Sequence, residues 1–137
     1  MADGNPHASL REIVDSAGED IFGPGRQLAV KQFGSRAYGA AGPRRDWDFF
    51  VALPADDARK AKLLRASIRK FLIDSNITKW NSCEDQPEKN TLAWTTTTKQ
   101  KVSINVSVEG AMKSQQQATA FLAAYFNQYP KLKKGGT

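Results

Sequence analysis

The sequence contains very little cysteine or histidine, the two residue types that hold most protein-bound zinc. It has one of each, Cys83 and His7. A single cysteine cannot form an internal disulfide, which is typical of proteins in a reducing compartment. A pair of such residues also falls short of the ligand set that a structural zinc site needs. Any metal ion bound here must therefore be held by oxygen ligands.

Long apolar runs are absent as well, since none approaches the about 20 residues of a membrane span. The opening segment MADGNPHASLRE has neither the basic, apolar character of a signal peptide nor the arginine-rich character of a transit peptide. We therefore expect a cytoplasmic or nuclear protein that does not bind a membrane. The length of 137 residues suits one domain. We place it at 9–130, between an N-terminal tail (1–8) and a basic, flexible tail (131–137).

The charge of the chain is uneven along its length. Residues 1–55 carry six Lys and Arg against seven Asp and Glu, whereas residues 56–137 carry fourteen against seven. A basic surface attracts polyanions such as RNA or nucleotides, although the same charges also serve solubility. The sequence leaves both interpretations open.

Hydrophobic periodicity predicts an α+β (mixed α/β) fold with helices on one face of a mixed sheet. Ser9 and Glu12 form a capping-box pattern that predicts a helix start, followed by apolar residues at helical spacing. The other expected elements are strands at 27–33, 46–53, 77–80, 90–98 and 101–108, a polar loop at 81–89, and helices at 55–75 and 113–129.

Two acids head the second strand, in the segment DWDFFVAL. In a strand, side chains two residues apart point to the same face, so Asp46 and Asp48 should project together while Trp47 and Phe49 face the core. Two neighbouring carboxylates repel each other unless a cation lies between them, and Mg²⁺ suits such oxygen ligands. The simpler alternative is that this D-x-D triplet only forms a turn or cap.

The residues before this strand strengthen the first interpretation. Phe33, Gly34 and Ser35 follow an apolar strand, and a loop of ten residues (36–45) separates them from Asp46. This arrangement resembles the signature of the DNA polymerase beta-type nucleotidyltransferase superfamily. Its spacing is most similar to that of the template-independent poly(A) polymerases and terminal uridylyltransferases. The segment 101–133 resembles the family more loosely.

The resemblance implies a nucleotidyltransferase-type palm fold and roles for specific residues. Gly34 and Ser35 would bind the triphosphate of a nucleotide. Asp46 and Asp48 would hold Mg²⁺ or Mn²⁺ and act as catalytic carboxylates. The family's third carboxylate lies on the polar face of the strand at 101–108, where Asn105 aligns with it. Asn105 is thus a degenerate third catalytic position, because an amide brings no charge and takes no proton.

The chain also ends soon after the helix at 113–129, where the family continues into a helical domain. We therefore expect either a second chain that supplies this lobe or a different mode of selectivity. Small nucleotidyltransferases of toxin–antitoxin systems lack the lobe too, and they resemble the FGSRAYG segment.

Basic and aromatic side chains suggest a weak RNA-binding surface. Lys62, Arg65 and Arg69 recur along one predicted helix and would either track a phosphate backbone or form a solvated helix face. Trp80 and Trp94 would either stack on bases or belong to the core and to cross-strand pairs.

Three functional hypotheses follow. The protein is a reduced or inactive nucleotidyltransferase-fold protein (a pseudoenzyme) that binds nucleotide, RNA or a protein partner. Alternatively, it is an active, small Mg²⁺-dependent nucleotidyltransferase that adds nucleotides to RNA or another acceptor. The third possibility is a basic α+β binding domain without nucleotide chemistry. Asn105 favours the first hypothesis.

Overall fold

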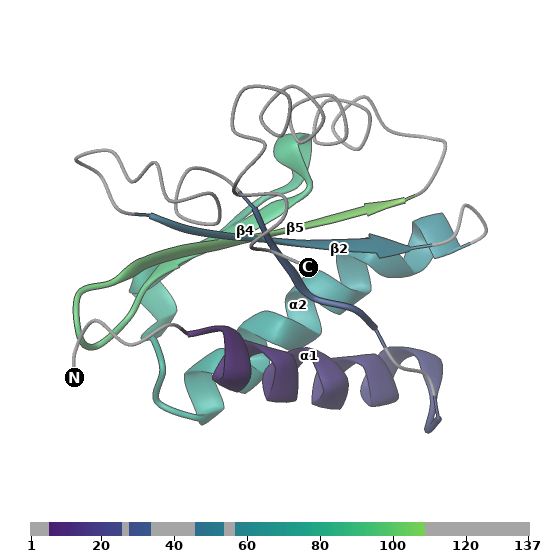
Figure 1. Cartoon of the computed structure of the whole chain (residues 1–137), viewed down its shortest axis with the longest axis horizontal. Helices are drawn as coiled ribbons and strands as arrows, with labels where there is room; N and C mark the ends of the chain where they lie inside the picture. The colour runs from purple at the N-terminus through teal and green to yellow at the C-terminus, as the bar shows by residue number, and fades with distance from the viewer. Residues whose placement is uncertain (1–5, 26–27, 34–45, 54–56, 109–137) are drawn as a thin grey trace, which may run out of the picture.

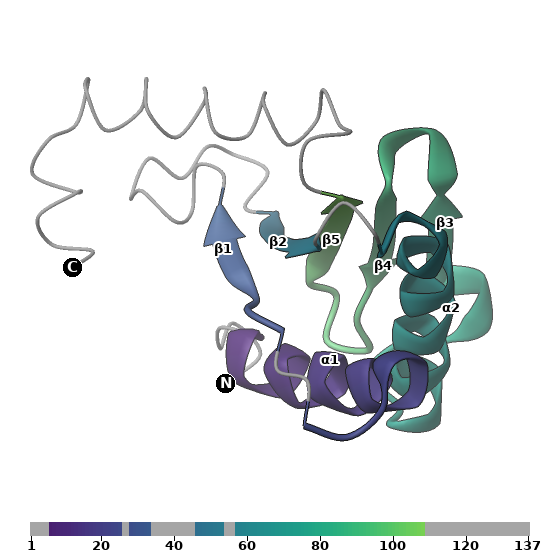
Figure 2. The same cartoon turned by 90° about the vertical axis from the view of Figure 1, so that its right-hand side faces the viewer.

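The structure is a computed structural model that describes residues 6–25, 28–33, 46–53 and 57–108. Within them, five strands form one mixed sheet in the order β1-β2-β5-β4-β3. The strands are β1 (Lys31–Phe33), β2 (Trp47–Leu53), β3 (Cys83–Gln86), β4 (Thr91–Thr95) and β5 (Lys101–Val108). β2 and β5 are parallel, and the other pairs are antiparallel. Figure 2 shows the five strands side by side in this order.

Two helices, α1 (His7–Phe22) and α2 (Ala58–Asp74), pack on the same side of this sheet (Figure 1). The predicted α+β class, with a mixed sheet and helices on one face, is thereby confirmed. Two short 3-10 helices, η3 (Trp80–Ser82) and η4 (Pro87–Lys89), flank β3. Among the described residues, no helix is long and apolar enough to cross a membrane.

The core lies between the helices and the inner face of the sheet. β2 and β5 alternate as predicted, and Phe49, Val51, Ile104 and Val106 are fully buried. The apolar stripes predicted on the two helices meet this face; they comprise Leu10, Ile13, Val14, Ala17, Ala61, Leu64, Ile68 and Leu72. Because every second side chain of a strand faces the helices, the outer face of the sheet carries the intervening side chains, most of which are polar.

The start of α1 corrects the predicted capping box. The helix begins at His7, its N-cap is Pro6, and no side chain caps it. His7 therefore does not lie in a tail: its ring stacks on Phe49 at 5.4 Å between centroids, and its Nε2 donates to the carbonyl of Val30 (2.9 Å). These contacts extend the helix beyond the predicted start at Ser9.

The strand predicted at 77–80 is wrong, and so is the loop predicted at 81–89, because β3 lies within the latter range. The Thr78 hydroxyl donates to the carbonyl of Thr95 (2.7 Å), and the Ile77 carbonyl accepts from the amide of Thr97 (3.1 Å). These bonds hold residues 77–80 outside the hydrogen-bonded strands of the sheet. β3 itself has the polar sequence CEDQ, which an edge strand tolerates because only one neighbour pairs with it.

The remaining differences concern element ends. β1 covers only the last part of the strand predicted at 27–33, and β4 is shorter than 90–98 because residues after Thr95 turn toward β5. In that turn Lys99 has a left-handed φ of 70°, and the amide of Thr96 donates to the carbonyl of Gln100 (2.8 Å). The helix predicted at 113–129 lies outside the described residues.

Candidate nucleotide site

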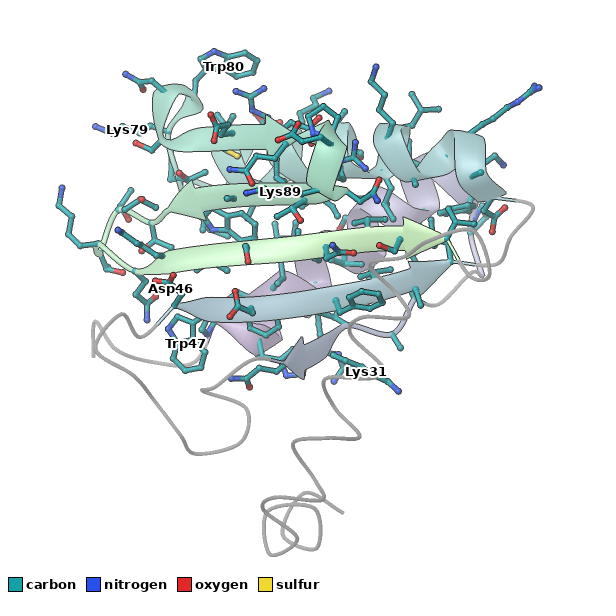
Figure 3. The ribbon with its side chains drawn as sticks, turned by 90° about the horizontal axis from the view of Figure 1, so that it is seen from above. Lys31, Asp46, Trp47, Lys79, Trp80 and Lys89 are labelled. Carbon is teal, nitrogen blue, oxygen red and sulfur yellow. The ribbon has the colours of Figure 1, made fainter. Side chains whose placement is uncertain are left out.

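Asp46 and Asp48 lie on the outer face of the sheet and line one cavity of about 450 Å³. Trp47 and Phe49 point to the core, where they are 6% and 0% exposed. The predicted geometry of the acid pair is therefore confirmed. Figure 3 looks onto this outer face and shows Asp46 at the start of β2. Asp46 precedes the strand by one residue, so that the pair stands at its N-terminal end.

Ser103, and not Asn105, is the β5 residue opposite the acid pair. In the parallel register Asp48 pairs with Ser103, and Asn105 pairs with Phe50. The hydroxyl of Ser103 donates to Oδ1 of Asp48 (2.9 Å). Asn105 shares the face but is displaced by one pair along the strand. Alternation had shown only that these residues share a face, whereas the register depends on how β2 and β5 align.

The side chain of Asn105 is held by β4 and η4. Its Nδ2 donates to the carbonyl of Lys89 (3.0 Å) and contacts the hydroxyl of Thr91 (3.4 Å). Its Oδ1 accepts a hydrogen bond from the hydroxyl of Ser107. The amide therefore bridges β5 to β4 and η4.

Electrostatics of the acid pair favour a cation. Burial raises the pKa of Asp48; the hydrogen bond from Ser103 lowers it, and repulsion by Asp46 raises it further. Oδ1 of Asp46 is buried and has no hydrogen-bond partner among the described residues. A buried oxygen without a partner, next to a second carboxylate, matches the ligands of a hard divalent cation. The two side chains therefore fit the Mg²⁺ or Mn²⁺ that the fold implies.

The protein supplies few ligands for such an ion. Across the part of the chain that the structure describes, no three Asp, Glu, His or Cys side chains group in a way that could hold a metal. β5 carries no carboxylate between Lys101 and Val108. Mg²⁺ ordinarily keeps several waters and takes its remaining ligands from substrate phosphates. The site thus suits one ion shared with a phosphate ligand.

The cavity has a floor of small side chains between acidic walls. One row across the sheet runs from Asp48 through Ser103 and Ala93 to Glu84. Because neighbouring strands are about 4.8 Å apart, Glu84 stands roughly 14 Å from Asp48 and cannot share its ion. The full lining is Asp46, Asp48, Asn81, Ser82, Cys83, Glu84, Ala93, Trp94, Thr95, Lys101, Val102 and Ser103.

The charges of this lining oppose the entry of a bare anion. Three carboxylates, those of Asp46, Asp48 and Glu84, face one ammonium, that of Lys101. A polyphosphate would be repelled by this balance unless a divalent cation accompanied it. The electrostatics therefore couple phosphate binding to metal binding.

Gly34 and Ser35, the predicted triphosphate ligands, lie outside the described residues. Phe33, which precedes them in the sequence, is the last residue of β1 and pairs with Asp48. The role of the Gly-Ser pair stays a prediction.

The structure corrects the predicted surface stripe on α2. Lys62 is exposed, but Arg65 is 3% exposed, and its Nε donates to Oδ1 of Asp85 (2.7 Å). Arg69 is partly buried and donates to the carbonyl of Cys83 (2.9 Å). Both arginines thus fasten α2 to β3. As for the two tryptophans, Trp94 belongs to the core and Trp80 is exposed.

Comparison with solved structures finds proteins of similar fold. The chain superposes on a cytoplasmic RNA terminal U-transferase with a TM-score of 0.58, at 16% identity over 89% of this chain. It also superposes on terminal uridylyl transferase 4 from Trypanosoma brucei, solved with bound GTP, with a TM-score of 0.50, at 17% identity over 90% of this chain. The chain has the nucleotidyltransferase palm fold.

The nucleotidyltransferase fold accounts for only part of those proteins: the chain spans 31% of the first and 35% of the second. A cyclic dinucleotide synthase of the CdnE type, from Elizabethkingia meningoseptica, matches more weakly, with a TM-score of 0.44 at 15% identity over 74% of this chain and 36% of the synthase. No protein-family model matches the sequence, and no curated protein matches it.

Proposed function

We propose that the chain binds a nucleoside triphosphate together with one divalent cation in the cavity of Asp46 and Asp48, and that by itself it does not transfer the nucleotide. The observation that carries this proposal is that β5 presents the hydroxyl of Ser103 to Asp48 and has no carboxylate between Lys101 and Val108. One of the similar structures is that of an RNA terminal U-transferase, so RNA is the acceptor that we would test first.

Each residue of the site has a part in binding. Asp46 and Asp48 hold Mg²⁺ or Mn²⁺, which supplies positive charge for the triphosphate. Gly34 and Ser35 bind the phosphates through backbone amides and a hydroxyl. Ser103 orients Asp48 through its hydrogen bond.

The missing step is deprotonation and positioning of an attacking hydroxyl. A serine that already donates to Asp48 brings no negative charge to a second metal site and is no base at neutral pH. A protein partner that contributes an acid and a base-binding lobe would complete the site.

A binding experiment tests the first half of the proposal. Titration calorimetry with UTP and GTP should show binding in Mg²⁺ and none in EDTA. Asp46→Asn and Asp48→Asn should abolish it, while Glu84→Gln, which alters a carboxylate of the same cavity, should retain it. Equal loss in all three variants would show that general charge, and not the acid pair, governs binding. Retention in all three would favour the basic binding domain without nucleotide chemistry.

A primer-extension assay tests the second half. Labelled nucleoside triphosphates, Mn²⁺ or Mg²⁺ and an RNA primer should yield no extended product with the wild-type chain. Extension that disappears in Asp48→Asn would overturn the inactive assignment and establish the alternative, an active small nucleotidyltransferase. The two halves can thus fail separately.

A further inference from the structure

A second cavity, of about 350 Å³, lies between α2 and the edge strand β3. It is lined by Arg65, Ala66, Arg69, Lys70, Ile73, Asp74, Trp80, Asp85 and Leu92. The binding site described above uses none of these residues. The cavity joins an apolar interior, formed by side chains such as Leu92, to a charged rim.

Trp80 is the unusual member of this lining. It is 66% exposed, although it is a large aromatic side chain. The guanidinium of Arg69 lies 3.8 Å from the centre of its ring, and Nη2 of Arg69 donates to the carbonyls of Cys83 (2.9 Å) and Trp80 (3.4 Å). The arginine thus holds one face of the indole. Because most of the ring's surface stays exposed, the remaining face is open for a flat ligand.

Charge around the ring favours an anionic ligand. Asp85 is paired with Arg65, and the other charged residues of the lining are the cations Arg69 and Lys70 and the anion Asp74. Lys79 immediately precedes Trp80, and Figure 3 shows both side chains projecting from one corner of the sheet. An open aromatic face among lysines is the arrangement with which proteins bind single strands of nucleic acid.

The platform also lies close to the first cavity. η3 consists of three residues; Trp80 lines the second cavity, and Asn81 and Ser82 line the cavity of Asp46 and Asp48. Figure 3 shows Trp80 and Asp46 toward the same end of the sheet. A strand that stacks on Trp80 therefore enters the first cavity by crossing this short turn, and it reaches the acid pair after a further three strand spacings, roughly 14 Å, along that cavity.

We propose that Trp80 is a stacking platform for single-stranded nucleic acid, whose phosphates contact Lys70 and Lys79 and whose end crosses η3 toward Asp46 and Asp48. The direction of the strand rests on the function proposed above. The platform itself rests on the exposed indole, the arginine that fixes it and the surrounding lysines.

Fluorescence anisotropy with a short, fluorescein-labelled single-stranded RNA, and with DNA of the same length, tests the platform. Trp80→Ala should weaken binding about 5-fold to 100-fold, the range that base stacking on an aromatic ring provides. Leu63→Ala is the matched control, because Leu63, on α2, is also a large exposed apolar residue (54%) and lies outside both cavities, and it should leave affinity unchanged. Trp80→Phe should fall between wild type and Trp80→Ala.

Two further measurements distinguish base stacking on Trp80 from nonspecific electrostatic attraction. Binding should quench tryptophan fluorescence in wild type and not in Trp80→Phe, because Trp47 and Trp94 are buried. The double variant Lys70→Ala with Lys79→Ala should show a weaker salt dependence of affinity, because it makes fewer contacts with the phosphates. Stronger binding of RNA than of DNA would indicate that the 2′-hydroxyl groups of the ribose also contact the site.

The inference is overturned if neither nucleic acid binds, if Trp80→Ala binds as wild type does, or if Leu63→Ala loses as much affinity. Self-association that Trp80→Ala abolishes, without any nucleic-acid binding, would assign this surface to a protein interface instead. Titration of Trp80→Ala with UTP and Mg²⁺ separates the two proposals. Retained nucleotide binding alongside lost RNA affinity supports both, whereas unchanged RNA affinity refutes only the platform.

Discussion

Ser103→Asp is the most direct test of the register between β2 and β5. The substitution places a carboxylate opposite Asp48, where the wild-type hydroxyl donates a hydrogen bond of 2.9 Å. Without a metal ion the new charge repels Asp48, and the hydrogen bond is lost. With a bound divalent cation the new carboxylate becomes a third ligand.

The expected magnitude follows from this geometry. Two unit charges about 4 Å apart near a protein surface repel by about 4 kcal/mol, and the partial exposure of Asp48 reduces this to about 2 kcal/mol. Loss of a hydrogen bond to a charged group adds about 1.5 kcal/mol. We therefore expect Ser103→Asp to lower the free energy of unfolding in EDTA by about 3.5 kcal/mol, or roughly 12 °C in Tm.

Thermal unfolding in EDTA and in Mg²⁺ measures both states. Mg²⁺ should restore most of the loss in Ser103→Asp and should stabilise it more than it stabilises wild type. Asn105→Asp is the control: its carboxylate would face the carbonyl of Lys89, so it should be destabilised to a similar extent in EDTA and Mg²⁺. If Mg²⁺ instead rescued Asn105→Asp and not Ser103→Asp, the register argument would be refuted.

Three other predictions concern stability and reactivity. Asp85→Ala should cost about 3 kcal/mol in urea unfolding because it leaves the buried Arg65 cation without its partner, whereas Arg65→Met should cost less; equal costs would contradict this account of the pair. The pKa of Asp48 is raised in the folded state, so wild-type stability should fall as pH rises above the unfolded value of 3.8, and Asp48→Asn should not show this fall; parallel pH profiles of the two proteins would argue against the shift. Burial raises the pKa of the Cys83 thiol, so iodoacetamide should label it far more slowly in the native protein than in urea, and equal rates would show that the thiol is accessible.

Local patterns in the chain were sufficient for much of the fold. The alternation at 101–108 is that of a strand with one buried face, and β5 has these bounds. The apolar spacing around Leu64 and Ile68 predicted α2, because a helix must bury one stripe against the sheet. The pair Asp46 and Asp48 followed from the two-residue period of a strand alone.

Other features could not be predicted from the sequence, because they depend on contacts between residues that are far apart in the chain. β3 is polar except for the buried Cys83, and its strand conformation depends on pairing with β4 and on the ion pair between Asp85 and Arg65. The prediction of an exposed basic stripe on α2 was wrong for Arg65 and Arg69 for the same reason. An arginine on a helix looks solvent-exposed in the sequence, and only the packing of α2 against β3 buries it.

The sequence by itself determined the elements that carry their own periodicity and the existence of an acid pair on one face of a strand, because both depend on spacing within a single segment. The tertiary structure decided which residue of β5 meets that pair. A shift along β5 by one pair of residues keeps the same side chains on the outer face, so alternation cannot distinguish Ser103 from Asn105. Only the alignment of β2 with β5 places Ser103 against Asp48 and turns Asn105 toward β4.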